Sequence, residues 1–458
     1  MPPVSEGIFD REHRALTIGS ILAMSTVAFE GLALVTVAPL VARDLGGEAL
    51  YGWIFSAFLL TQIVSTVLAG QQIDRRGPAT PFAVSLVLFG AGLVVGSLAQ
   101  SMPVLIAGRA LQGLGAGAVA TCVYAVVNRN YVDALRPRMM ATISTAWIVP
   151  SLVGPAIAGI IAEAFTWRVV FAGIVPLLVI SGVLATPAFR GDPGAAATAR
   201  TGDRRLGQAI ALAIGAGAFL AGLATTPVVL GAALAIAGLA VAVPAMRSLL
   251  PPGTLTARPG LPAVIATRAM FVSAFFTGDA FLILALTDVG GYRTSVAGLV
   301  ISAASLAWTS GSWLQVRIDR RSGAGSRRDR VRWGVVLVAT GVTALTVITA
   351  VTGSPPIALA IVAWVVAGLG IGLAHSTIST MAFAHATGGE EGTVSSSLLL
   401  ADLGTPALTI GIGGALVALA GARGWAPETG VLLAFLVSVT AAALAGFAAS
   451  RMPRGAPA

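Results

Sequence analysis

The fold is indicated most directly by residues 105–117, which read LIAGRALQGLGAG. One cation, Arg109, stands in an otherwise apolar stretch, and a glycine recurs at every second position from Gly113 to Gly117. Glycines at this spacing remove side chains from part of a helix surface, so that neighbouring helices can approach closely. The run GLGIG at 368–372 repeats the pattern 255 residues later. We therefore predict two closely packed helices in equivalent places of a repeated unit.

The composition of the whole chain indicates the medium in which these helices fold. Hydrophobic side chains make up 56% of the 458 residues and charged ones 10%, whereas soluble domains carry about 25% charged residues. This composition is typical of an all-α integral membrane protein, in which one span needs about 20 apolar residues. We predict fourteen spans, separated by breaks rich in Gly, Pro and charge, at residues 15–40, 50–70, 79–99, 103–127, 139–163, 168–188, 206–224, 227–246, 264–288, 294–316, 332–352, 356–384, 393–420 and 429–450.

The arginines predict the orientation, because short loops rich in Lys and Arg stay cytoplasmic. With the N-terminus inside, 22 of the 28 Arg residues fall in inner loops and tails, four fall in outer loops, and Arg109 and Arg268 fall within spans. We therefore expect a multi-pass protein of a bacterial plasma (inner) membrane with both termini in the cytoplasm. The formal net charge of +9 follows from this topology, so it gives no reason to expect a nucleic acid partner.

The sequence has few of the residues that form metal sites and disulfides. The chain has one cysteine, Cys122, and three histidines, His13, His375 and His385. A single thiol excludes a disulfide framework and a multi-thiolate metal site, and the histidines are scattered along the sequence. We expect neither a metal nor a cofactor.

A second repeat indicates how the chain is divided. The tetrapeptide IDRR closes the second span at 73–76 and the tenth span at 318–321. Two six-helix halves of parallel orientation, related by an axis along the membrane normal, are a known transporter plan. The halves keep the same orientation only if the insert between them crosses the membrane an even number of times. We expect a six-helix bundle at 1–188, a linker with two additional spans at 189–260, and a second six-helix bundle at 261–458.

Two motifs in the first half resemble those of a known transporter family. Residues 70–77, GQQIDRRG, are similar to the motif G-x-L-x-D-R-x-G, and residues 105–117 are close to G-R-x-x-Q-G-x-G-x-G. On these motifs the chain resembles the major facilitator superfamily, and within it the fourteen-span drug:proton antiporters. The resemblance implies two six-helix bundles related by a pseudo-twofold axis, with two extra spans between them. It also implies an inner gate formed by residues at helix ends; the alternative is that these charges only fix the membrane topology. The gate residues are Gly70, Asp74, Arg75 and Gly77 and, through the repeat, Asp319 and Arg320.

The fifth span resembles the antiporter motif of the same family. Residues 154–159, GPAIAG, match the core of G-x3-G-P-x2-G-G, although Pro150 stands where the upstream glycine belongs. Pro150 and Pro155 remove two amide donors from one helix and so bend it. The bend is either a hinge on which the halves rock or a static kink. The expected hinge residues are Pro150, Gly154, Pro155 and Gly159.

Ionisable side chains inside the membrane are the main candidates for function. A charge at the bilayer centre costs about 2.5–3.5 kcal/mol on insertion scales, so such a residue by default faces a partner or a cavity. Glu30, Asp279 and Asp402 lie well inside predicted spans, as does Arg109. In the resembled family the first helix carries an acidic residue followed by a proline, and the spacing between them is the same as that between Glu30 and Pro39. We assign Glu30 and Arg109 to proton coupling; a buried structural ion pair is the alternative.

Aromatic residues accompany the remaining acids. Phe275 and Phe276 stand beside Asp279, and three tryptophans lie deep in their spans. An apolar, aromatic cavity with few polar groups suits lipophilic ligands, and carboxylates in it would attract a cationic one; helix packing is the alternative. His375 is either a proton relay or a polar contact. The predicted substrate cavity contains Asp279, Asp402, Phe275, Phe276, Trp147, Trp308, Trp364 and His375.

Together these features predict a secondary active transporter and not an enzyme. We expect export of amphiphilic or lipophilic, drug-like small molecules by proton antiport through alternating access, with the proton gradient as the energy source. The expected partners are the substrate, protons and membrane lipids, and we expect a monomer. Export of an endogenous lipid or natural product is the alternative within transport. A membrane scaffold would not need charges at mid-membrane depth, and a membrane-embedded enzyme would need an intramembrane nucleophile or metal cluster.

Overall fold

The computed structural model describes residues 7–10, 13–132, 135–186, 189, 200–225, 227–322, 324–385 and 391–453, and the secondary-structure elements in these ranges are helical. The first group comprises α1 (Arg14–Asp44), α2 (Tyr51–Arg76), α3 (Ala79–Ser97), α4 (Met102–Asn130), α5 (Arg136–Thr145), α6 (Ile148–Ala164) and α7 (Trp167–Ala185). An insert follows, made of α8 (Arg200–Leu223) and α9 (Val228–Leu249). The last group comprises α10 (Leu261–Leu284), α11 (Thr294–Ser322), α12 (Arg327–Thr352), α13 (Ile357–Phe383), α14 (Glu391–Ala422) and α15 (Pro427–Ser450). Short helical turns lie at η1 (Glu48–Leu50), η3 (Thr254–Thr256), η4 (Ala285–Val289), which is a π turn, and η5 (Ala324–Ser326).

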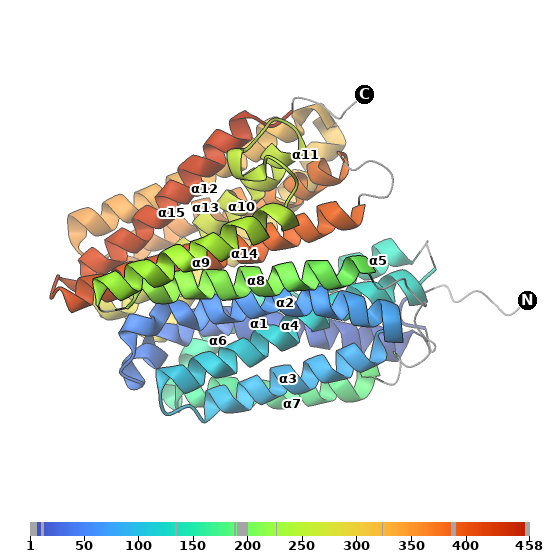
Figure 1. The fold of residues 1–458 in the computed structure, drawn as a ribbon, viewed down its shortest axis with the longest axis horizontal. Helices are drawn as coiled ribbons and strands as arrows, with labels where there is room; N and C mark the ends of the chain where they lie inside the picture. The colour runs from blue at the N-terminus through green and yellow to red at the C-terminus, as the bar shows by residue number, and fades with distance from the viewer. Residues whose placement is uncertain are drawn as a thin grey trace, which may run out of the picture.

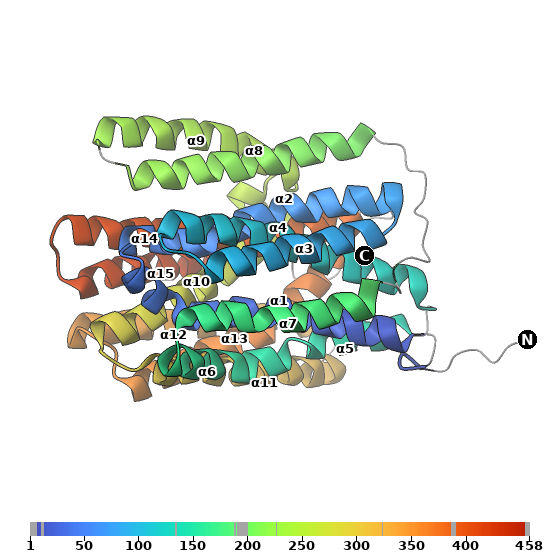
Figure 2. The same cartoon turned by 90° about the horizontal axis from the view of Figure 1, so that it is seen from below.

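The helices run side by side along the longest axis of the molecule, with α1 to α7 in one part and α10 to α13 with α15 in the other (Figure 1). The insert α8–α9 forms a hairpin on one flank (Figure 2), where α8 contacts both α2 and α14. The near end of the molecule is defined here as the end at which α1 begins and α15 ends. The opposite, far end carries the turns between α1 and α2, α6 and α7, and α10 and α11.

Among the described residues, twelve helices are long and apolar enough to cross a membrane: α1, α2, α3, α4, α7, α8, α9, α10, α12, α13, α14 and α15. The chain is therefore a multi-pass, all-helical membrane protein. Two of the fourteen predicted spans, 139–163 and 294–316, are not among these twelve. The first is divided between α5 and α6, and the second is α11, which carries Ser, Thr, Gln and Arg side chains that lower its hydropathy. Residue 188, where the first bundle is expected to end, lies outside the described residues.

A proline accounts for the break between α5 and α6. Pro150 has no N–H for the carbonyl of Ala146 one turn earlier, and its ring clashes with that carbonyl. The helix accordingly stops at Thr145 and restarts at Ile148. Ser25 Oγ of α1 donates a hydrogen bond to the carbonyl oxygen of Ala146 (3.0 Å). The backbone group freed by the break is therefore satisfied from a neighbouring helix, as the interior of a membrane protein requires.

The glycine runs of α4 and α13 pack in the same manner. A Cβ atom on Gly113 would lie 2.2 Å from a backbone oxygen of α2, and one on Gly115 would lie 2.5 Å from a side chain of α3. In the second half, a Cβ atom on Gly372 would lie 2.0 Å from a backbone oxygen of α11, and one on Gly370 would lie 2.6 Å from a backbone oxygen of α12. Only glycine permits these approaches. The two halves therefore share one packing plan, with α13, α11 and α12 corresponding to α4, α2 and α3.

Candidate functional site

The two groups of helices meet closely at the far end, along α2 with α14 and along α6 with α11. A Cβ atom on Gly414 of α14 would lie 2.6 Å from Gly52 Cα of α2, and one on Gly159 of α6 would lie 2.6 Å from Ser295 Cα of α11. Side chains at these positions would push the helices apart. Gly159, one of the predicted hinge residues, therefore lies at a crossing between the halves.

Polar contacts tie the halves together at the same end. Glu163 of α6 accepts hydrogen bonds from the backbone N–H of Ser295 (Oε1, 2.7 Å) and from Arg293 Nη2 (Oε2, 2.7 Å). Ser295 is in the first turn of α11, where free N–H groups and the helix dipole favour a carboxylate. The hydroxyl of Tyr51 donates to the carbonyl oxygen of Ala280 in α10 (2.7 Å). The far end is closed by contacts that would have to break for the halves to separate there.

The other hinge candidates lie along the same helix. Pro150 is in the first turn of α6, directly after the break. A Cβ atom on Gly154 would lie 3.4 Å from the ring of Phe29 in α1, an ordinary contact, whereas one on Gly298 of α11 would lie 2.7 Å from the carbonyl oxygen of Pro155. Thus α6 contacts α1 of its own half and α11 of the other, and a change in its bend would move both contacts.

A buried ion pair joins α1 to α4. Arg109 Nη1 contacts Glu30 Oε1, and Gln112 Nε2 donates to the same oxygen (3.3 Å). Glu30 and Arg109 are each 2% exposed. Arg109 Nε also donates to the carbonyl oxygen of Ile54 in α2 (2.9 Å), and its guanidinium lies 4.3 Å from the centroid of the Phe58 ring. The pair therefore connects three helices of the first half.

One oxygen of this carboxylate stands apart from the network. Within the described part of the chain, no hydrogen-bond donor contacts the buried Glu30 Oε2. A buried carboxylate oxygen without a donor is costly while the group is charged, and it is the position at which a proton can be added without displacing Arg109 from Oε1. The motif at 105–117 contains Gln112, but the pattern alone does not mark it as a site residue. Its place one turn after Arg109, on the same helix face, was the available signal.

The predicted aromatic residues of the second half meet in one cluster. Phe275 stacks on Trp364, with 5.2 Å between ring centroids and 15° between planes, and meets Trp308 edge to face at 5.6 Å. Phe276 contacts both Phe275 and Trp308. The indole N–H of Trp364 donates to Asp279 Oδ1 (2.8 Å). Asp279 is 3% exposed, so α10, α11 and α13 pack around a buried acid.

Asp402 of α14 is paired with a cation. Arg268 of α10 donates from Nε to Asp402 Oδ1 and from Nη2 to Oδ2 (2.8 Å). Its Nη1 donates to the carbonyl oxygen of His375 and to the hydroxyl of Ser379 (3.2 Å), both in α13. The Arg268 side chain is 4% exposed and that of Asp402 is 27% exposed. The sequence places Arg268 within a span but gives it no partner; its depth in an apolar helix was the signal for a site residue.

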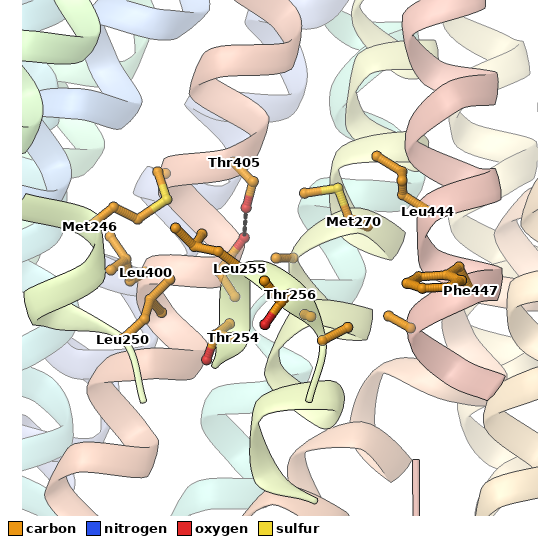
Figure 3. A pocket seen from close by; sticks show the side chains of 16 residues that line it. Met246, Leu250, Thr254, Leu255, Thr256, Met270, Leu400, Thr405, Leu444 and Phe447 are labelled. Carbon is orange, nitrogen blue, oxygen red and sulfur yellow. Dashed lines mark hydrogen bonds between the residues drawn. The ribbon is translucent and has the colours of Figure 1, made fainter. Parts of the chain in front are cut away.

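The remaining cavity candidates are placed differently. The ring of His375 lies 5.6 Å from that of Trp308, which links the aromatic cluster to the Arg268–Asp402 pair. Trp147 belongs to the first half, lies in the break before α6 and is 43% exposed. A pocket of about 270 Å³ lies at the near end between α9, α10, α14 and α15 (Figure 3), and the predicted cavity residues do not line it.

The predicted gate residues of the first half lie at the near end of α2. Asp74 and Arg75 are exposed in its last turn. Gly77 ends the helix with a φ of 77°, which favours glycine because a Cβ atom would be strained there. A Cβ atom on Gly70 would meet nothing within 4 Å, so packing does not require glycine at that position.

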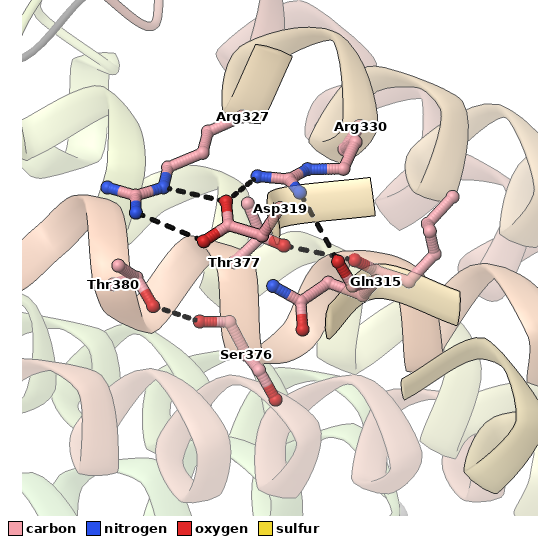
Figure 4. Close-up of polar contacts among 8 residues, drawn as sticks. Gln315, Asp319, Arg327, Arg330, Ser376, Thr377 and Thr380 are labelled. Carbon is pink, nitrogen blue, oxygen red and sulfur yellow. Dashed lines mark hydrogen bonds and ion pairs between the residues drawn. The ribbon is translucent and has the colours of Figure 1, made fainter. Parts of the chain in front are cut away.

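The corresponding acid of the second half ties two helices together. Asp319, beyond the predicted span 294–316, accepts hydrogen bonds from Arg327 (Nε to Oδ1, 3.2 Å) and from Arg330 (Figure 4). These hydrogen bonds lower the pKa of Asp319 to about 2. Both arginines belong to α12, so Asp319 joins the near ends of α11 and α12, while Arg320 is exposed.

Comparison with known proteins identifies the family. A family model, the Major Facilitator Superfamily, matches residues 16–402. The chain belongs to this superfamily. A probable multidrug-efflux transporter of Mycobacterium tuberculosis is 27% identical to it over 439 residues, 92% of each chain. The multidrug efflux pump SdrM of Staphylococcus aureus is 26% identical over 167 residues, 36% of this chain and 37% of that protein.

Solved structures share the fold of this chain. The crystal structure of a POT family transporter in complex with 5-aminolevulinic acid matches it with a TM-score of 0.72 at 14% identity, covering 95% of this chain and 96% of that one. This likeness supports the fold alone. The family and the relatives point to a membrane transporter and not to an enzyme. The part of the chain that the structure describes contains no group of three or more His, Cys, Asp or Glu residues arranged to hold a metal ion.

Proposed function

We propose that this superfamily member exports amphiphilic or lipophilic small molecules from a bacterial cell by proton antiport through alternating access, as a monomer. Two relatives, a probable multidrug-efflux transporter and a multidrug efflux pump, support the direction and the substrate class. The first of these aligns over 92% of both chains, so the inference applies to the whole protein. The proton gradient is the energy source, and no cofactor takes part.

The observation that carries the proposal is the buried Glu30–Arg109 pair, in which Glu30 Oε2 has no hydrogen-bond donor among the described residues. A proton on Glu30 cancels the charge that attracts Arg109, and loss of the proton restores it. Because Arg109 also bonds to Ile54 of α2, the protonation state of Glu30 biases the packing of three helices. One proton that crosses the full potential supplies about 2.3 kcal/mol per 100 mV, enough to shift a conformational equilibrium.

The proposal includes fourteen crossings of the membrane. α11 has 29 residues, which at 1.5 Å per residue gives about 43 Å, and it lies against α13 and α6. If α11 and the broken α5–α6 segment each cross, the twelve apolar helices become fourteen spans, as in the drug:proton antiporter subtype. Residues 1–188 and 261–458 are then the bundles and 189–260 the linker. From the distribution of arginines between the loops we infer that the near end, with both termini, is cytoplasmic.

The substrate is proposed to bind between the halves, against the aromatic cluster around Asp279. In this scheme we expect Trp147 to contact the substrate from the first half. Asp402 becomes available to a cationic substrate when Arg268 releases it. With the near end cytoplasmic, the contacts of Gly159 and Glu163 describe a state closed to the outside, and export requires those contacts to break.

The test is gradient-driven transport in proteoliposomes that contain the purified full chain. A fluorescent lipophilic cation is presented on the side that matches the cytoplasm, with the opposite side acidic. We expect the dye to accumulate in the acidic compartment and a protonophore to abolish the accumulation. Dye movement at the same rate with and without the pH gradient would favour a facilitator. A failure to transport any amphiphile of a broad panel would overturn the export proposal.

A further inference from the structure

The near-end pocket, whose lining side chains are drawn in Figure 3, lies outside the site described above. It is formed by the ends of α9 and α15, the turn η3, the first turns of α10, and α14. Its walls include Met246 and Met270, and three further lining residues, Leu255, Leu444 and Phe447, are 48%, 48% and 50% exposed. Large apolar side chains that are half exposed at a pocket rim indicate an apolar environment outside it.

The three threonine hydroxyls that line the pocket already donate hydrogen bonds. The hydroxyl of Thr405 donates to the carbonyl oxygen of Ala401 (2.9 Å), the bond drawn in Figure 3. Thr254 donates to the carbonyl oxygen of Pro251 (2.7 Å), and Thr256 donates to that of Gly253 (3.1 Å). No lining hydroxyl therefore has its proton free for a ligand among the described residues. The interior suits a hydrocarbon and not a polar molecule.

Small residues keep the space open. Ala257, Ala266 and Ala448 form a separate buried cluster at the pocket wall. Ala257 has a φ of 48°, the left-handed region, and is the one residue other than glycine in the described ranges to adopt it. Alanine is strained there. Strained residues that are held in place by packing are concentrated at functional sites.

One arginine stands at the edge of the pocket, and a second follows a lining residue in the sequence. Arg451 Nη1 donates to the carbonyl oxygen of Thr256 (3.0 Å), and its guanidinium lies 4.2 Å from the ring centroid of Phe447. Both partners line the pocket, which fixes Arg451 at its edge. Arg258 directly follows the lining residue Ala257 and is also exposed. The guanidinium of Arg451 therefore gives the pocket a cationic edge, while the interior is apolar.

We propose that this pocket binds an acyl chain of an anionic phospholipid, whose phosphate lies against Arg451 and Arg258. Basic groups beside crevices between transmembrane helices are suited to such head groups, and guanidinium pairs well with phosphate oxygens. The volume of about 270 Å³ lies below the roughly 300–1,000 Å³ of pockets that enclose drug-sized ligands, so a transported drug fits it less well than part of a lipid chain. The site is distinct from the Arg268–Asp402 pair and does not rest on the transport proposal.

Native mass spectrometry of the full chain in detergent tests the proposal, with dioleoyl phosphatidylglycerol and dioleoyl phosphatidylcholine as the probes. We expect the first phosphatidylglycerol to bind more tightly than phosphatidylcholine. Arg451→Gln should weaken that binding about fivefold, the effect of roughly one arginine near a phosphate. The matched control is Arg423→Gln at the far end, where the guanidinium also lies over an aromatic ring; it should leave the affinity unchanged. Equal binding of the two lipids, or no effect of Arg451→Gln, would overturn the head-group assignment.

The acyl chain is tested separately. Dihexanoyl phosphatidylglycerol, whose short chains fill little of the pocket, should bind more weakly than the dioleoyl lipid. Ala269→Leu places a larger side chain in the lining and should weaken binding of the dioleoyl lipid alone. Because that variant can fail to fold, Leu255→Ser at the exposed rim is the second variant, and it should also weaken binding. If the short-chain lipid binds as tightly as the long-chain lipid, the pocket is not the acyl site.

Discussion

The substitution Glu30→Gln tests the coupling mechanism most directly. Glutamine has nearly the shape of glutamate, and its amide oxygen can still accept from Arg109 and Gln112. What it removes is the negative charge and the ability to take up a proton. Arg109, which is 2% exposed, then lacks a counter-ion. Loss of one partner of a buried pair costs about 3–5 kcal/mol, and we expect about 3 kcal/mol because the carbonyl of Ile54, the Gln112 amide and the Phe58 ring still contact the guanidinium.

The effect on transport follows from the energy of the proton. One proton that moves down a pH difference of about 1.7 units yields about 2.3 kcal/mol, which corresponds to a gradient of about 50-fold for a cation exchanged one for one. In Glu30→Gln we expect this driven accumulation to fall to about onefold, because no proton is exchanged. Exchange of substrate down its own gradient should continue, because the aromatic cluster in the other half is unchanged.

The assay is dye accumulation in proteoliposomes with an imposed pH gradient and potential, beside dye equilibration without either. Glu48→Gln is the matched control: it makes the same chemical change in an exposed acid at the far end and should keep the full accumulation. Thermal unfolding of each variant reports folding independently. If Glu30→Gln accumulates dye as strongly as the parent, Glu30 does not couple the proton, and the pair with Arg109 is a structural ion pair.

Three further perturbations test the packing and the other charged groups. Gly159→Val places a side chain where even a Cβ atom would lie 2.6 Å from the facing helix, and we expect it to lower the stability by about 1–3 kcal/mol. The control Gly173→Val, in open space, should leave the thermal unfolding temperature nearly unchanged. Asp402→Asn leaves Arg268 buried without a counter-ion and should cost about 2 kcal/mol, near the lower limit for such pairs because Asp402 is partly exposed; a double variant with Arg268→Gln that recovers none of this loss would argue against the pairing. Because the pKa of Asp319 is lowered to about 2, its stabilising effect is present above the unfolded-state pKa of about 3.9 and is lost as the pH falls through about 2. The melting temperature of Asp319→Asn should therefore stay a constant interval below that of the parent between about pH 8 and pH 5. A difference in melting temperature that grows on acidification would contradict this.

Much of the fold could be predicted because its signals are local. An apolar run of sufficient length forms a spanning helix whatever its neighbours are, and twelve helices meet that description among the described residues. The two predicted spans that do not meet it have local causes as well. Pro150 divides one into α5 and α6, and polar side chains reduce the hydropathy of α11. A count based on apolar length alone therefore misses spanning helices that bury polar groups against one another.

The candidate site could be predicted in part. The depth of Glu30, Arg109, Asp279 and Asp402 in apolar helices was visible in the sequence, because a charge at that depth is costly wherever its partner lies. The partner of Asp402 was not visible, since Arg268 is 134 residues away. The same holds for Glu163, whose contact with Ser295 crosses 132 residues; as a single acid at a helix end it looks like any other residue of a loop boundary.

The sequence by itself predicted a multi-pass helical membrane protein, a repeat between its halves, and the few ionisable groups that lie inside its apolar helices. These properties depend on composition, length and spacing along one chain. Only the tertiary structure decided which charges pair, that the far end is the one held closed, and that an apolar pocket with a cationic edge forms where α9, α10, α14 and α15 meet. Those features depend on contacts between helices that are distant in sequence, where a difference of one residue in helix rotation decides whether a side chain meets a partner, the opposite half or the lipid.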